Sequence, residues 1–219
     1  MRRLGALFTA LPDLGLGAVY LVTWIVPYAF GRRMVAHLML VMLLEFIIVH
    51  SSGFMGSVLY SDARRVGKVT ATLGFGVFYT LFVAAFALAF GTWWPIWAFG
   101  GLTLNRLLGA VVGQAPTGAE KAYVLKGWAI GVIFYLAFVF TTTLLPIPAL
   151  GITSAVRASQ DLPGSGLWID APQRVIAFGF LYFTAWGISD LYGHRWLSTQ
   201  GLPTGKREAG TGGREASTG

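Results

Sequence analysis

The sequence predicts an all-α polytopic membrane bundle of about six transmembrane helices, on three observations. Of its 219 residues, 55% are hydrophobic and only 11% are charged, whereas about 25% of the residues of a soluble domain are charged. The apolar residues come in blocks of roughly 20, the length at which a helix crosses a ~30 Å hydrocarbon core. The basic residues gather in the short segments between these blocks. We therefore expect one transmembrane helical domain over residues 1–197.

The composition also limits the chemistry. The chain has no cysteine, which removes disulfides, thiolate metal sites and thiol catalysis. Its three histidines are too few for stacked haems, and zinc-protease, phosphate-loop and dinucleotide-binding motifs are absent from the sequence. The net charge of +7 lies mostly in the connections, where it indicates topology and attraction to anionic lipid. We expect no cofactor, no metal ion and no nucleic-acid partner, and the sequence favours a protein that is not an enzyme.

A very short turn joins the first two predicted spans. Pro12 and Asp13 predict the beginning of the first helix, with Asp13 as its N-cap, and residues 14–30 form the first span. Residues 31–33 leave almost no loop before the second span at residues 34–60. We expect these two spans to form a tight antiparallel hairpin.

Four further helices follow, joined by polar segments and one long loop. They are expected at residues 69–90, 93–113, 128–150 and 174–192. Residues 151–173 form the longest loop, because Gly, Ser and Pro interrupt it repeatedly. Glycines inside the spans permit close helix packing. Residues 198–219 are Gly-rich and polar, and they predict a disordered cytoplasmic tail.

The distribution of Lys and Arg predicts the orientation. If the N-terminus lies inside, twelve of the sixteen basic residues fall on the inner side. The other four fall on the outer side: Arg32, Arg33, Arg157 and Arg174. Basic residues are enriched in the cytoplasmic connections of membrane proteins. We therefore expect both termini in the cytoplasm, in a multi-pass protein of the cell inner membrane.

The second span carries the strongest candidate for a functional residue, Glu45. It falls near the middle of an apolar run, where an unpaired carboxylate costs several kcal/mol. At ~100° per residue Ser52 shares its helix face, whereas His50 lies roughly 140° away. Glu45 and His50 therefore cannot hold one ion from the same face. Glu45 is either a proton-binding or ion-binding carboxyl, or a hydrogen-bonded residue that holds two helices together.

Three other polar residues inside or at the ends of spans accompany Glu45. Arg106, in the fourth span, is the natural partner for a buried contact with Glu45, and the alternative is that its side chain reaches out to the lipid headgroups. Asp190 and His194 stand four residues apart at the inner end of the sixth helix, so they face the same way and form a pair at the water interface. Two such ligands do not make a metal site.

These residues support three hypotheses of function. The first is passage of a proton, ion or small solute through the bundle, centred on Glu45 with His50, Ser52 and Arg106 in support. The second is a structural or assembly subunit of a membrane complex, whose partners beside the lipid bilayer are further copies or other membrane subunits. The third is an intramembrane enzyme that uses these groups or the Asp190 and His194 pair on a lipid. A polar cavity beside Glu45 would favour transport.

Overall fold

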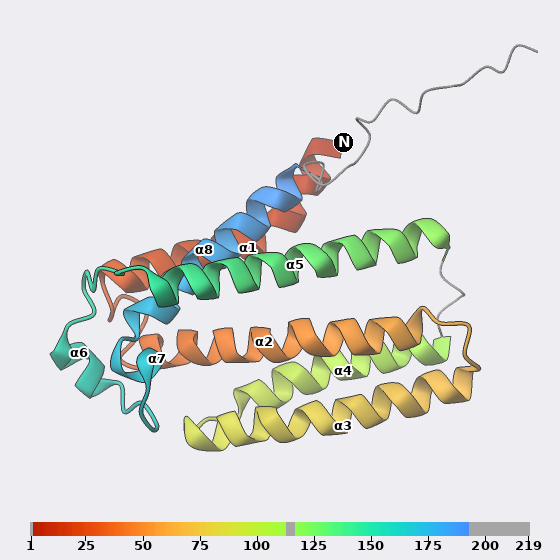
Figure 1. The fold of residues 1–219 in the computed structure, drawn as a ribbon, viewed down its shortest axis with the longest axis horizontal. Coiled ribbons are helices and arrows are strands. Elements are labelled where there is room, and N and C mark those ends of the chain that lie inside the picture. Colours follow the sequence, from red (N-terminus) through yellow and green to blue (C-terminus); the bar gives the residue numbers. More distant parts are fainter. Residues whose placement is uncertain (1, 113–116, 193–219) are drawn as a thin grey trace, which may run out of the picture.

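The protein is described by a computed structural model that covers residues 2–112 and 117–192 (Figure 1). Every regular element in these ranges is a helix, which confirms the predicted fold class. The helices are α1 (Arg2–Ile25), α2 (Met34–Leu59), α3 (Arg65–Ala89), α4 (Trp94–Val112), α5 (Gly118–Leu144), α6 (Ser154–Ser159), α7 (Leu167–Asp170) and α8 (Gln173–Leu191). The predicted tail at residues 198–219 lies outside the described residues.

Five of the helices in the described ranges are long and apolar enough to cross a membrane, namely α1 to α5. The protein is therefore a multi-pass membrane protein. The sixth predicted helix is present as α8, but polar residues at its two ends keep it out of this group of five. A sixth crossing, the cytoplasmic position of the termini and the choice of the inner membrane remain predictions.

Helix α2 is the centre of the bundle. In its most apolar stretch 56% of the residues are buried inside the protein, compared with 17–28% in the other four spans. Helices α3, α4, α5 and α8 all pack against it, and Figure 1 shows it between α5 on one side and the α3–α4 pair on the other. Exposed Leu, Phe and Val side chains cover the outer faces of α3, α4 and α5, as expected for surfaces in contact with lipid.

The predicted hairpin of the first two spans is wrong, because α1 packs along α8 and makes few contacts with α2. Figure 1 shows the α1–α8 pair leaving the axis of the other helices at an angle. Glycine permits this close packing. A Cβ atom on Gly179 of α8 would lie 2.2 Å from the ring of Tyr20, and one on Gly17 of α1 would lie 2.7 Å from the Thr184 hydroxyl.

Several predicted helix boundaries of the first and fifth spans are also wrong. Helix α1 begins at Arg2 and continues through Pro12, so Asp13 lies within a helix and is not its N-cap. Pro12 is exposed, where its missing N–H and its ring disturb the packing least. Helix α5 begins at Gly118, ten residues before the predicted position 128, and ends at Leu144 because two prolines follow closely.

The long connection between α5 and α8 is folded against the ends of the spans. It contains the short helices α6 and α7, where the sequence predicts only loop. Gln160, fully buried, donates a hydrogen bond from Nε2 to the Arg32 carbonyl (2.7 Å) and accepts one at Oε1 from the Ala36 N–H (3.3 Å). The Gln160 amide therefore satisfies one of the N–H groups that the first turn of α2 leaves without a helical partner.

The Arg174 side chain hydrogen-bonds to backbone groups at the end of α5, as Gln160 does at the beginning of α2. Its Nη1 donates to the carbonyl oxygens of Thr142 (2.7 Å), Thr143 (2.9 Å) and Leu145 (3.0 Å). The first two carbonyls belong to the last turn of α5 and the third follows it directly. No helical N–H reaches carbonyls at this end of a helix, and a positive charge there is favoured by the helix dipole. Arg174 therefore fixes the beginning of α8 against the end of α5.

Candidate functional site

One face of α2 receives a row of side-chain hydrogen bonds from three other helices. The receiving groups lie at positions 38, 42, 45 and 49, a spacing of four, three and four residues that repeats on one side of a helix. We call them the acceptor stripe: the carbonyl oxygens of Leu38, Met42 and Val49 and the carboxyl group of Glu45. The donors, in that order, are Tyr20, Tyr135, Tyr182 and Trp128. The stripe therefore ties α1, α5 and α8 to α2.

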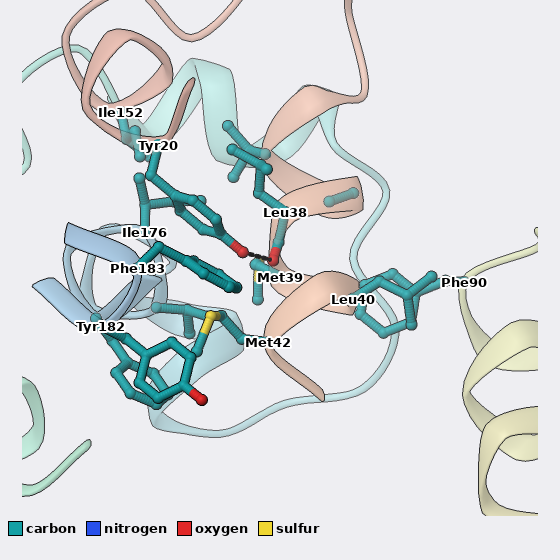
Figure 2. Packing of buried hydrophobic residues seen from close by; sticks show 14 of the residues in the cluster. Tyr20, Leu38, Met39, Leu40, Met42, Phe90, Ile152, Ile176, Tyr182 and Phe183 are labelled. Atoms are coloured by element: carbon teal, nitrogen blue, oxygen red, sulfur yellow. Dashed lines mark hydrogen bonds between the residues drawn. The ribbon is translucent and has the colours of Figure 1, made fainter. Parts of the chain in front are cut away.

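Figure 2 shows the first of these contacts. The Tyr20 hydroxyl of α1 donates to the Leu38 carbonyl at 2.7 Å, and the Tyr20 ring stacks on Phe183 of α8 with 5.6 Å between centroids. Tyr20 is fully buried. Because a buried hydroxyl without a partner would cost about 1–3 kcal/mol, this hydrogen bond fixes how α1 and α8 sit on α2.

Glu45 occupies the third position of the acceptor stripe. It lies eleven residues after the beginning of α2 and fourteen before its end, about 16 Å and about 21 Å along the axis. The Tyr182 hydroxyl of α8 donates to Glu45 Oε1 at 2.7 Å. Tyr182 is buried, and it stands among the rings of Tyr135, Phe178 and Trp186. Among the described residues, the carboxyl group therefore has one hydrogen-bond partner, in an aromatic neighbourhood near the middle of α2.

Asp13 of α1 brings a second carboxyl group to this neighbourhood. Its charge acts on both the Glu45 carboxyl and the Tyr182 hydroxyl. Asp190 of α8 acts in turn on Asp13. Asp13 therefore interacts electrostatically with groups on both α2 and α8.

The packing of α1 on α8 orders these groups along the bundle. Gly187 of α8 lies against Leu14 of α1, the neighbour of Asp13. Asp13 therefore lies nearer the end of α8 than Tyr182 does, and Asp190 lies in its last turn. Glu45, Tyr182, Asp13 and Asp190 form a series from the middle of α2 to the end of α8.

Arg106 does not pair with Glu45, so the first of the two alternatives for Arg106 is wrong. Its guanidinium group donates from Nη1 to Ser51 Oγ at 3.0 Å and to Met55 Sδ at 3.2 Å, and from Nη2 to Ser52 Oγ. Ser51 and Ser52 lie six and seven residues after Glu45, about 10 Å further along α2. Arg106 instead binds α4 to the second half of α2.

His50 and Ser52 line a cavity between the second half of α2 and the first half of α5. The cavity has a volume of about 670 Å³. His50 Nδ1 lies 2.8 Å from the Phe46 carbonyl oxygen, and because that oxygen only accepts, Nδ1 carries the proton. Glu45 does not line this cavity or either of the other two described. The polar cavity beside Glu45 that would favour passage of a solute is therefore none of these three.

Three other combinations of polar residues were considered from the sequence: Glu45 with His50, a metal-binding group, and Asp190 with His194. Glu45 faces α8 whereas His50 lines the cavity toward α5, so the two do not converge on one site. Within residues 2–112 and 117–192 no group of three His, Asp or Glu side chains is placed to hold a metal ion. His194 lies outside the described residues, so its pairing with Asp190 remains a prediction.

Sequence reasoning missed the tyrosines and Asp13. Tyr20, Tyr135 and Tyr182 fall in the interior of apolar helices, where a hydroxyl needs a hydrogen-bond partner. A tyrosine in such a position therefore predicts a buried hydrogen bond, although the sequence does not show which backbone or side-chain group accepts it. Asp13 was interpreted as a helix start because Pro12 precedes it.

Comparison with known proteins gave no match: no family model, no curated protein and no solved structure is similar to this chain. The contacts around Glu45 and the cavity beside His50 are therefore the features of the molecule that bear on its function.

Proposed function

We propose that the protein translocates protons across the membrane, with Glu45 as the group that binds the proton inside the bilayer. The observation that carries this proposal is the 2.7 Å hydrogen bond from the Tyr182 hydroxyl to Glu45 Oε1 near the middle of α2. Carboxyl groups inside transmembrane segments are rare, and they mark proton relays and ion pathways.

The surroundings of Glu45 favour a proton over a larger substrate. A metal cation needs several oxygen ligands, whereas the hydrogen bond described for the carboxyl group comes from a single hydroxyl group, that of Tyr182. A proton needs only a chain of groups that both donate and accept hydrogen bonds. The Tyr182 hydroxyl is such a group, since it passes its own proton to Glu45 while its oxygen accepts another.

The series of groups from Asp190 to Glu45 supports one half of a proton path, the half between the end of α8 and the middle of α2. Asp13, beside Gly187, and Asp190, in the last turn of α8, lie further toward the end of α8 than Tyr182 does. Water molecules between these groups would complete the hydrogen-bonded chain, as they do between polar groups separated by more than 3.5 Å. In this scheme a proton taken up at Asp190 reaches Asp13, then Tyr182, and then Glu45, whose carboxylate becomes a neutral carboxylic acid.

The test is proton flux into liposomes that contain the purified protein and a pH-sensitive dye, driven by a potassium diffusion potential. The unmodified protein should acidify the lumen, and Glu45→Gln should lower the rate to that of empty liposomes, because an amide of the same shape cannot take up the proton. Tyr182→Phe and Asp13→Asn should each slow the flux by at least about tenfold, as for removal of a positioned proton-transfer group.

Asp62→Asn provides the matched control. Asp62 is an exposed carboxylate outside the spans, at 3.8 Å from Lys121 Nζ, so its loss should leave the rate unchanged. Thermal unfolding of each variant in detergent shows whether a lost flux reflects a lost fold. A flux that survives Glu45→Gln, or no flux from the folded unmodified protein, would refute the proposal.

A further inference from the structure

The cavity between α2 and α5 has the shape of a site for one lipid chain. Its walls are mostly apolar, with Gly56 on α2 and Leu125 and Trp128 on α5 among the lining residues. From His50 to Tyr60, the residue that follows α2, it extends over ten residue steps of the chain, about 15 Å, or half of a ~30 Å hydrocarbon core. Its volume of about 670 Å³ lies within the ~300–1,000 Å³ typical of ligand pockets.

Glycine keeps this cavity open. A Cβ atom on Gly56 would meet no atom within 4 Å, so the space beside it is unfilled. Gly53, one turn earlier, is different: a Cβ atom there would lie 2.9 Å from the Trp128 ring, whose Nε1 donates to the Val49 carbonyl at 3.0 Å. Trp128 is thus held as a wall of the cavity, and Gly56 is a position where a side chain would enter it.

One end of the cavity carries a positive charge. Lys121, in the first turn of α5, lines it near Tyr60 at the end of α2. The Lys121 ammonium has one carboxylate within 4 Å among the described residues, that of Asp62 at 3.8 Å, which is fully exposed. An exposed pair of this kind is weak, so an anionic headgroup can replace the Asp62 carboxylate beside Lys121.

We propose that this cavity binds a phospholipid with an anionic headgroup, with the phosphate group at Lys121 and one acyl chain along the groove toward His50 and Trp128. The charge at one end and the apolar walls beyond it match the two parts of such a molecule. The site is separate from the Glu45 series, so this proposal is independent of proton translocation.

Photocrosslinking tests the proposal with two probes of identical chains. The full-length protein is placed in phosphatidylcholine vesicles with a small fraction of diazirine-bearing phosphatidylglycerol or diazirine-bearing phosphatidylcholine, and labelled peptides are mapped by mass spectrometry. We expect the anionic probe to label residues 50–60 and 121–128 about fivefold more than the zwitterionic probe, the preference that one lysine near a membrane surface provides. Equal labelling by both probes, or labelling spread evenly over the lipid-facing helices, would overturn the proposal.

Two matched pairs of variants separate the contributions of shape and charge. Gly56→Leu should fill the cavity and reduce labelling there to the level of the outer faces, whereas Gly100→Leu, on an exposed part of α4 with open space around it, should change nothing. Lys121→Gln should remove the preference for the anionic probe, whereas Lys126→Gln, on the same helix but not lining the cavity, should keep it. Unchanged labelling in Gly56→Leu would refute the site even if proton flux is found, and Glu45→Gln should leave the labelling intact.

Discussion

At the scale of single residues, the two charged groups near the middle of α2, Glu45 and Arg106, both bond to hydroxyl groups. Glu45 has Tyr182, and Arg106 has Ser51 and Ser52. A buried ion pair between Glu45 and Arg106 would require both groups at one level of α2. The serines instead hold Arg106 about 10 Å further along the helix, so the two charged residues belong to separate contacts, one with α8 and one with α4.

This separation predicts additive effects of mutation. Arg106→Gln should lower the free energy of unfolding by about 1.5–3 kcal/mol, because it removes charged hydrogen bonds to hydroxyl groups. Glu45→Gln should cost less than about 1 kcal/mol, since its amide oxygen still accepts from Tyr182. The double variant should equal the sum within about 0.5 kcal/mol, as for residues more than 7–10 Å apart.

Unfolding in detergent measures this double-mutant cycle. Arg65→Gln is the control, because Arg65 is exposed at the beginning of α3, and it should change stability by no more than about 0.5 kcal/mol. A double variant clearly more stable than the sum would mean that Glu45 and Arg106 interact after all.

At the scale of elements, the pair of α1 and α8 depends on glycine. Gly179→Ala places a methyl group 2.2 Å from the Tyr20 ring, so the ring must move and its hydrogen bond to Leu38 is strained. We expect a loss of about 1–3 kcal/mol, the usual cost of overpacking. Gly15→Ala on α1, where a Cβ atom has open space, should be neutral or slightly stabilising, as expected for alanine in a helix. Thermal unfolding of both variants makes the comparison, and an equal stability of the two would argue against this close approach of α1 to α8.

The sequence predicts most elements correctly, for a clear physical reason. Residues 34–59 and 94–112 are helices within one residue of their predicted bounds, because an apolar block of fixed length is bounded by Gly, Pro or charge. Helix pairing is harder to predict. A transmembrane helix is apolar on all sides because lipid surrounds the protein, so its buried face has no hydrophobic periodicity that the sequence could reveal. The pairing of α1 with α8 depends instead on small residues and a tyrosine that come together only in the folded protein.

The candidate site was predictable only in part. Glu45 was identifiable because a carboxyl group inside an apolar run needs a partner. The partner itself, Tyr182, lies 137 residues away in the chain, and no local pattern relates the two. The position of Lys121 at one end of the cavity was also not predictable, because the sequence predicts Lys121 to lie in a polar connection and not in α5.

At the scale of the whole molecule, the direction of each helix bears on topology. Successive long helices alternate in direction, and Figure 1 shows the beginning of α1 and the end of α8 close to each other. Such an arrangement is compatible with an even number of crossings if α8 crosses with the rest. The connection between α2 and α3 then lies on the same side as the beginning of α1 and the end of α8, and the segment between α6 and α7 lies on the opposite side.

Cysteine labelling can test this arrangement directly, because the natural chain contains no cysteine. Asp62→Cys lies in the connection between α2 and α3, and Ser165→Cys lies in the exposed segment before α7. Both positions are exposed, so substitution should leave the fold intact. In intact cells a membrane-impermeant maleimide should label Ser165→Cys, whereas Asp62→Cys should react only after the membrane is made permeable, since basic connections stay in the cytoplasm. The opposite pattern would reverse the orientation, and labelling of both from one side would mean that one of the spans between them, α3, α4 or α5, does not cross the bilayer.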